Sequence, residues 1–268
     1  FRALKENTTG TNNTAVGFDA LKENTTGNGN TAVGKGAMPA TTTGDNNVAV
    51  GKDAMQDNTT GSQNTALGQN ALADNTTANN NTAVGYKALR VSYGANNTAV
   101  GCDALLANTT GAQNTAVGDQ ALQDCTTASG ATAVGRNALG SITDATNVVA
   151  IGENAGDAKS SGDSLVAVGR NALTSVTTGN SNTAVGTNAG YAIAGGSNNT
   201  FIGHYSGMLH STANNTGLGA MALYNTSGDN NTGIGQGTLQ GVSGSNNTCL
   251  GYSASTSAGD SSNQITLG

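Results

Sequence analysis

The sequence is poor in the residues that build a globular core. Its 268 residues include no tryptophan and one proline, and aromatic residues make up only 3% of the chain. This composition leaves little bulky apolar material for a conventional core. Charged residues are also scarce, at 10%, whereas disordered chains are usually rich in charge and proline. These absences argue against an ordinary globular domain and against a disordered chain.

Further absences disfavour several classes of function. The formal net charge of −6 offers no basic stripe for a phosphate backbone, so we expect no nucleic-acid partner. No apolar run approaches the roughly 18 residues needed to cross a bilayer, so we expect no membrane insertion of this segment. Cys102, Cys125 and Cys249 have neither metal-ligand spacing nor the pattern of a disulfide framework. We therefore predict three free thiols.

What the sequence does contain is one motif, commonly Asn-Thr-Ala-Val-Gly, that recurs along the whole chain. The glycine that closes the motif, called here the marker glycine, occurs sixteen times, and the step between markers is 17 residues, or 16 at four places. Such a fixed period predicts a repeat solenoid in which each repeat forms one coil. The marker glycines are Gly17, Gly34, Gly51, Gly68, Gly85, Gly101, Gly118, Gly135, Gly152, Gly169, Gly186, Gly203, Gly219, Gly235, Gly251 and Gly268.

The residues before each marker glycine predict a short strand in every coil. The residue directly before the marker is always aliphatic, and the residue two earlier is Thr, Val or Ile. β-branched residues favour strands, and residues i and i+2 of a strand share a face. We therefore predict that both positions point into the core. The core residues expected on this basis include Val16, Val50, Val84, Val117, Ile151, Val185, Ile202 and Leu218.

A second apolar position lies four residues after the marker glycine, as in Leu21 and Leu72. We interpret it as a second short strand, so that one coil has two strands and two turns. The turns contain Asn-Thr-Thr-Gly, whose Gly and Asn tolerate the positive φ of tight corners. The predicted fold class is all-β. It is a parallel β-solenoid, or β-roll, of about sixteen coils of 16–17 residues, forming one repeat segment over residues 1–268.

The residue between the two predicted core positions is small in nearly every coil. A solvent-facing position would normally collect long polar side chains, so we predict an outward ridge that packs against another copy of the chain. The alternative is a flat exposed face. The predicted inter-chain interface consists of Ala15, Ala32, Ala49, Ala66, Ala83, Ala99, Ala116, Ala133, Ala150, Ala167 and Ala184.

Three stretches carry a resemblance to a known family. "NVVAIGENAG" (147–156), "LVAVGRNAL" (165–173) and "NVAVGKDAM" (47–55) resemble the SVAIG-type repeat in the heads of YadA-type trimeric autotransporter adhesins. Similar Asn-Thr-Ala-Val-Gly arrays occur in phage tail-fibre-like proteins, and the resemblance covers the whole chain. It implies a left-handed β-roll and a homotrimer. The repeat of those heads is commonly shorter, and the coil here is longer at the Asn-Thr-Thr-Gly turn.

The chain offers no recognisable catalytic or metal-binding constellation. Glycoside cleavage needs two carboxylates about 5–10 Å apart. The acids, such as Asp19 and Asp53, instead occupy turn positions beside lysines such as Lys22, which is typical of a solvated turn face. His204 and His210 are isolated from other metal-ligating residue types. We therefore predict no enzymatic activity, no metal site and no cofactor.

These patterns predict a non-catalytic structural segment, the shaft or head of a trimeric surface or virion fibre used in adhesion or host attachment. We expect an extracellular location and contact with a host receptor, glycan or matrix through other domains. Because residues 1–10 repeat residues 18–27 almost unchanged, we expect this segment to be a fragment of a longer fibre. The alternative is a binding module in which the solenoid's own face, such as its Thr-Thr pairs, binds glycan, matrix or ice. A third possibility is a depolymerase.

Overall fold

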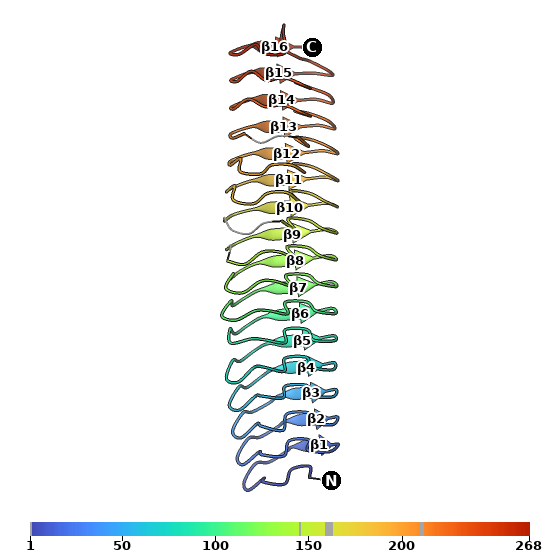
Figure 1. Cartoon of the computed structure of the whole chain (residues 1–268), viewed down its shortest axis with the longest axis vertical. Helices are drawn as coiled ribbons and strands as arrows, with labels where there is room; N and C mark the ends of the chain where they lie inside the picture. The colour runs from blue at the N-terminus through green and yellow to red at the C-terminus, as the bar shows by residue number, and fades with distance from the viewer. Residues whose placement is uncertain (1, 145, 159–162, 210–211) are drawn as a thin grey trace. The chain divides into compact units, whose positions relative to one another are not determined.

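The computed structural model describes residues 2–144, 146–158, 163–209 and 212–268, and in these residues it is all-β with no helix. The chain forms two compact units, Phe1–Ala131 and Thr132–Gly268, which are described separately. The first contains seven strands and the second contains nine (Figure 1). The strands of the first unit are β1 (Thr14–Val16), β2 (Thr31–Val33), β3 (Val48–Val50), β4 (Thr65–Leu67), β5 (Thr82–Val84), β6 (Thr98–Val100) and β7 (Thr115–Val117). Those of the second unit are β8 (Thr132–Val134), β9 (Val149–Ile151), β10 (Val166–Val168), β11 (Thr183–Val185), β12 (Thr200–Ile202), β13 (Thr216–Leu218), β14 (Thr232–Ile234), β15 (Thr248–Leu250) and β16 (Ile265–Leu267).

Within each unit, every strand pairs in parallel with the next strand along the chain. In the first unit Ala99 pairs with Ala116, and in the second unit Ala167 pairs with Ala184. Equivalent residues of successive repeats therefore lie side by side, one coil for each strand. This arrangement is a parallel β-solenoid, and it confirms the predicted fold class. The handedness of the coils stays a prediction.

The strands face the opposite way from the prediction. In β7, the central Ala116 has no exposed surface, whereas Val117 is 37% exposed. The threonines at the first strand position, such as Thr115, are half-buried on the same outer side as the valines. The prediction that these third-position residues form the core is therefore wrong. All of them are exposed except Val84, which is half-buried. These residues are Val16, Val50, Val84, Val117, Ile151, Val185, Ile202 and Leu218.

The alanines predicted to face outward instead line the inside of the coil. Ala15, in the first strand, is half-buried, and the others have no exposed surface. The prediction that these alanines form an inter-chain interface is wrong, because a buried methyl group does not reach a second chain. The fully buried members are Ala32, Ala49, Ala66, Ala83, Ala99, Ala116, Ala133, Ala150, Ala167 and Ala184.

The reversal has a physical cause, which is the narrow interior of the coil. A second column of buried alanines, three residues after most marker glycines, lies against the strand centre, as Ala121 and Ala172 illustrate. Where Thr238 replaces this alanine, the strand centre is Gly233, and a Cβ there would lie 2.7 Å from Thr238 Oγ1. Interiors are closely packed, so a larger residue on one side requires a smaller one opposite. Only a small side chain fits at most strand centres, and Val and Thr therefore point outward.

Phe201 is the large exception to this rule, and its surroundings explain it. Its ring is fully buried at the centre of β12, where other strands have Ala, Gly, Cys or Thr. A Cβ at Gly207 would overlap the Phe201 ring, and a Cβ at Gly217 would lie 3.1 Å from its Cδ1. A Cβ at Gly190 would also approach the ring, at 3.3 Å. Three neighbouring glycines thus provide the volume that one phenylalanine occupies.

The second predicted strand does not form. The apolar residues four positions after the marker glycine are fully buried, but they lie in turns with left-handed φ between 48° and 55°. Burial of these side chains offsets the cost of a conformation that bulky residues rarely adopt. Each coil therefore has one strand and a series of turns. The turn residues of this column are Leu21, Met38, Met55, Leu72, Leu89, Leu105, Leu122, Leu139, Leu173, Leu223 and Leu239.

Candidate functional site

The strongest candidate for a functional surface is the outer side of the parallel strands. Each strand presents its first and third residues outward, and no strand contains a charged residue. We call this surface, made by β1–β7 in the first unit and by β8–β16 in the second, the outer sheet face. Its third-position column is apolar throughout, and eleven of its members are between 36% and 43% exposed. These are Val50, Leu67, Val100, Val117, Val134, Ile151, Val185, Ile202, Leu218, Ile234 and Leu250.

A buried ladder of asparagines holds successive coils in register behind this face. The side chain of Asn64, which precedes β4, accepts a hydrogen bond from the Asn81 backbone N–H at 2.9 Å. Its amide also donates to the Ala78 carbonyl at 2.9 Å. Both groups lie in the next coil, so one side chain satisfies two backbone groups that would otherwise be buried without partners. The asparagine ladder therefore fixes the spacing and register of the coils that carry the outer sheet face.

Close to the boundary between the units, apolar residues replace asparagine at the ladder position. Ala131 occupies the ladder position at the end of the first unit, and Val148 and Leu165 occupy it in the second. All three are fully buried. In the next coil the ladder position is asparagine again: the Asn182 side-chain oxygen accepts a hydrogen bond from the Asn199 backbone N–H at 3.0 Å. Both units therefore contain amide-bonded coils, and apolar packing replaces the amides at these three positions.

The Thr-Thr pairs of the turns are mostly occupied with internal bonding. Thr25 Oγ1 donates to the Thr42 carbonyl at 3.1 Å, and Thr59 Oγ1 donates to the Thr76 carbonyl at 3.0 Å. In most of these pairs only the second residue is exposed, as in Thr26 and Thr60, whereas both are exposed at Thr8–Thr9 and Thr177–Thr178. The exposed second threonines form a single narrow column, which Tyr93 interrupts in the first unit. This geometry is weaker support for a binding face than the two-column outer sheet face.

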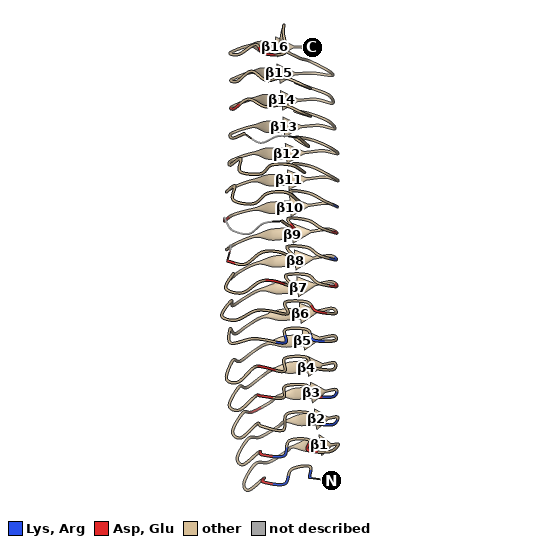
Figure 2. Ribbon diagram, viewed as in Figure 1, with Lys and Arg blue, Asp and Glu red and all other residues tan. Residues whose placement is uncertain are grey.

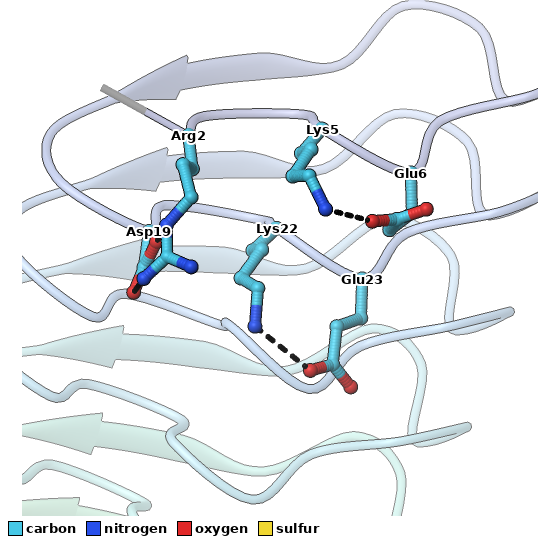
Figure 3. A network of polar contacts seen from close by, with 6 residues as sticks. All are labelled: Arg2, Lys5, Glu6, Asp19, Lys22 and Glu23. Atoms are coloured by element: carbon cyan, nitrogen blue, oxygen red, sulfur yellow. Dashed lines mark hydrogen bonds and ion pairs between the residues drawn. The ribbon is translucent and has the colours of Figure 1, made fainter.

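Charged side chains lie in the turns and leave the strands free of charge (Figure 2). Figure 3 shows the group at the start of the chain, where Arg2 Nε lies 2.9 Å from Asp19 Oδ1 in the next coil. Lys22 Nζ lies 3.3 Å from Glu23 Oε1. Solvent-exposed pairs of this kind contribute about 0–1 kcal/mol each. They agree with the predicted turn face in which acids and lysines mix.

The three cysteines are free, and their surroundings differ. Cys102 is exposed in a turn, where partial desolvation and the Asp103 carboxylate raise the pKa of its thiol. Cys125 is buried, and desolvation raises the pKa of its thiol to about 12. Cys249 is buried at the centre of β15. A buried thiol with a raised pKa is inert, because the thiolate is the reactive form.

The described residues contain no metal cluster and no enclosed pocket. Among the described residues, no group of three or more His, Cys, Asp or Glu could hold a metal ion. His204 is exposed, and His210 lies outside the described residues. Across the ranges that the structure describes, no helix has the length and apolar character to span a membrane.

Comparison with known proteins finds no family model and no curated protein that matches this chain. The outer sheet face is therefore the feature of this chain that points most directly to a function. Sequence reasoning placed the alanines on this face because it assigned the larger aliphatic residues to the core. The signal that could have located the face correctly is the pairing of two small columns, one at the strand centre and one three residues after the marker glycine.

Proposed function

We propose that this chain is a non-catalytic structural segment, the shaft or head of a homotrimeric surface or virion fibre that serves adhesion or host attachment. Other domains of the fibre would contact the host receptor, glycan or matrix, and the segment would lie outside the cell. The observation that supports the proposal is the outer sheet face, an uncharged surface whose aliphatic column is half-exposed in coil after coil.

The size of this face fits contact with other copies of the chain. Strands about 4.8 Å apart and three residues, or about 10 Å, long give each coil roughly 50 Å² of outer surface. The sixteen strands of the two units therefore contribute roughly 750 Å² per chain, close to the approximately 800 Å² that each partner buries in a standard interface. About half of this surface is the aliphatic third-position column, and the other half is mainly threonine.

The chemistry of the face favours a partner with the same surface. The strand backbones already bond to neighbouring strands, so a partner can dock only through side chains. Valine, isoleucine and threonine methyl groups pack well against their own kind, and threonine hydroxyls can bond to one another across an interface. The absence of charge means that identical faces do not repel. The number of copies, three, comes from the resemblance to YadA-type heads.

A pair of lysine substitutions on the face tests the proposal. Val100→Lys combined with Val117→Lys places two charges on adjacent strands, where each side chain points to solvent in a single chain. The variant should therefore fold normally as judged by circular dichroism. In an assembly the same charges would be buried without partners, at a cost of several kcal/mol. Light scattering should give the mass of three chains for the natural protein and of one chain for the variant.

The matched control adds the same charge elsewhere in the first unit. Gln69→Lys combined with Cys102→Lys uses the exposed position directly after the marker glycine, which Lys35 and Lys52 occupy in other coils. This control should keep the mass of the natural protein. A double valine variant that keeps the natural mass would contradict the proposal.

A further inference from the structure

A second surface, in the second unit, departs from the repeat in another way. Tyr and Met side chains gather in the turns that follow β11, β12 and β13. The His204 and Tyr205 rings lie 4.0 Å apart between centroids, and the Tyr205 and Tyr224 rings meet edge to face at 6.4 Å. Edge-to-face packing of this kind holds aromatic rings in fixed orientations. We call this group the aromatic patch, and its members are Tyr191, His204, Tyr205, Met208, Met221 and Tyr224.

Hydrogen bonds between the turns bring these residues together on three successive coils. The Met221 N–H donates to the His204 carbonyl at 2.9 Å, and the Tyr205 N–H donates to the Thr187 carbonyl at 3.1 Å. The Ala192 N–H donates to the Met208 carbonyl at 2.9 Å. Tyr191, Met208 and Tyr224 therefore follow one another in a column, each five residues after its marker glycine. The patch is partly open to solvent: Met221 is 38% exposed and His204 is exposed, and the three tyrosines and Met208 are half-buried.

Two of these residues occupy a position that is otherwise polar or glycine. The second residue after the marker glycine is Asp, Asn, Gln, Lys, Ser or Gly in every coil except those of Tyr205 and Met221. The backbone there is left-handed, with φ of 58° at Tyr205 and 56° at Met221. Asn and Gly suit this conformation, whereas bulky side chains rarely adopt it. Burial offsets the cost of this conformation at turn residues such as Leu223, whereas Met221 is 38% exposed, and uncompensated conformations of this kind concentrate at functional sites.

The charge of the region limits what the patch can bind. Residues 171–268 contain no Lys or Arg, and their acids are Asp229 and Asp260. All ten Lys and Arg residues precede this segment, and those that the structure describes are blue in Figure 2. Arg170 takes the position of His204 two coils earlier, so a nucleic acid, an anionic glycan or an anionic membrane would find few cations to replace its counterions. A neutral partner fits the charge distribution, and aromatic rings fit a partner with an apolar face.

We propose that the aromatic patch binds a neutral saccharide. The C–H groups on one face of a pyranose ring are apolar and weakly positive, and they match the electron-rich face of a tyrosine ring. Side chains that can form hydrogen bonds to sugar hydroxyls are also present. They are those of His204 and the exposed Gln240, with Gln240 held beside the patch by a 3.4 Å bond from its Nε2 to the Met221 carbonyl. This surface is separate from the outer sheet face, so the inference holds or fails independently of the fibre.

Binding can be measured with defined neutral probes. Isothermal titration calorimetry of the whole chain with cellohexaose, maltohexaose and chitohexaose should give a Kd of about 1 mM or lower for at least one of them. Because the protein has no tryptophan, the same titration should change its tyrosine fluorescence. Polygalacturonate, which is anionic, should bind more weakly than the best neutral probe. No binding of any neutral probe, or tighter binding of polygalacturonate, would overturn the proposal.

A variant that restores the repeat separates binding from folding. Tyr205→Asn combined with Met221→Asn introduces the residue best suited to this backbone conformation, so the Tm should stay equal or rise. Saccharide binding should weaken by about tenfold or more, the loss expected for a well-placed aromatic contact. The control Tyr252→Asn changes another tyrosine of the second unit, one that is 76% exposed, and should bind as the natural protein does. Unchanged binding by the double variant would contradict the proposal. A change in the oligomeric mass of the variant would also contradict it, because the patch would then lie in a contact between chains.

Discussion

At the scale of single residues, the marker glycine determines how closely successive coils stack. Gly203 has a φ of 133°, and a Cβ built on it would lie 2.5 Å from the carbonyl oxygen of Gly219 in the next coil. The contact is with backbone, which cannot move aside as a flexible side chain could. Both the conformation and the close approach therefore require glycine at this position.

We expect Gly203→Ala to lower the free energy of unfolding by about 2 kcal/mol or more, since it combines an unfavourable φ with a steric overlap. Gly195 in the same unit is a matched control. A Cβ there would meet only Thr178 Oγ1, at 3.7 Å, and its φ is not in the left-handed region. Gly195→Ala should change stability by less than about 1 kcal/mol. Urea denaturation measures both, and equal midpoints for the two variants would contradict this account of the marker glycine.

The cysteines give a second prediction at this scale. In the folded protein at neutral pH, Ellman's reagent should modify Cys102 and leave Cys125 and Cys249 unmodified, because only Cys102 is exposed. Its reaction should be slow near pH 7 and accelerate as the pH rises, since partial desolvation and the Asp103 carboxylate raise the pKa of the thiol and the thiolate is the nucleophile. Rapid modification of all three thiols without denaturant would show that Cys125 and Cys249 are not buried.

At the scale of the coil, the asparagine ladder connects each repeat to the next. Asn64→Ala should destabilise the first unit by about 2 kcal/mol, because it leaves the Asn81 N–H and the Ala78 carbonyl buried without partners. The neighbouring Gln63 is exposed, so Gln63→Ala is a control that should change stability by less than about 0.5 kcal/mol. Hydrogen exchange should show lost protection near residue 64 first, because coils interact with their neighbours. Equal stability of the two variants would mean that the ladder contributes nothing.

The position of every strand could be predicted from the sequence, but the face that each strand buries could not. A Thr-Ala-Val strand has two faces, and hydrophobicity alone assigns the valine to the core. The deciding factor is the space inside the coil, which depends on residues outside the strand such as Thr238 opposite Gly233. The left-handed turns at residues such as Leu72 were also not predictable, because leucine normally avoids that conformation.

The packing around Phe201 could have been predicted from coincident departures from the repeat. Phe201 departs from the alanine column, and Gly190, Gly207 and Gly217 depart from their own columns in the same or adjacent coils. Departures that coincide in this way indicate contact across the coil, since one side chain gains the volume that others lose. The outer sheet face and the aromatic patch needed the structure, because each depends on which way the backbone directs a side chain.

At the scale of the whole molecule, the two candidate surfaces have different chemistry and different positions in the repeat. The outer sheet face is apolar and recurs in every coil of both units, which suits contact with identical chains. The aromatic patch occupies turns of three successive coils in the second unit, which suits a small neutral ligand. Both are uncharged, and the ion pairs lie in the turns.

The central claim is that the outer sheet face joins copies of this chain. Sedimentation equilibrium of the natural protein over a wide range of concentrations tests it most directly. We predict a mass of three chains of 26.2 kDa each, unchanged on dilution to concentrations well below those used for purification. A single species with the mass of one chain at every concentration would contradict the claim, because the aliphatic column would then remain exposed to water.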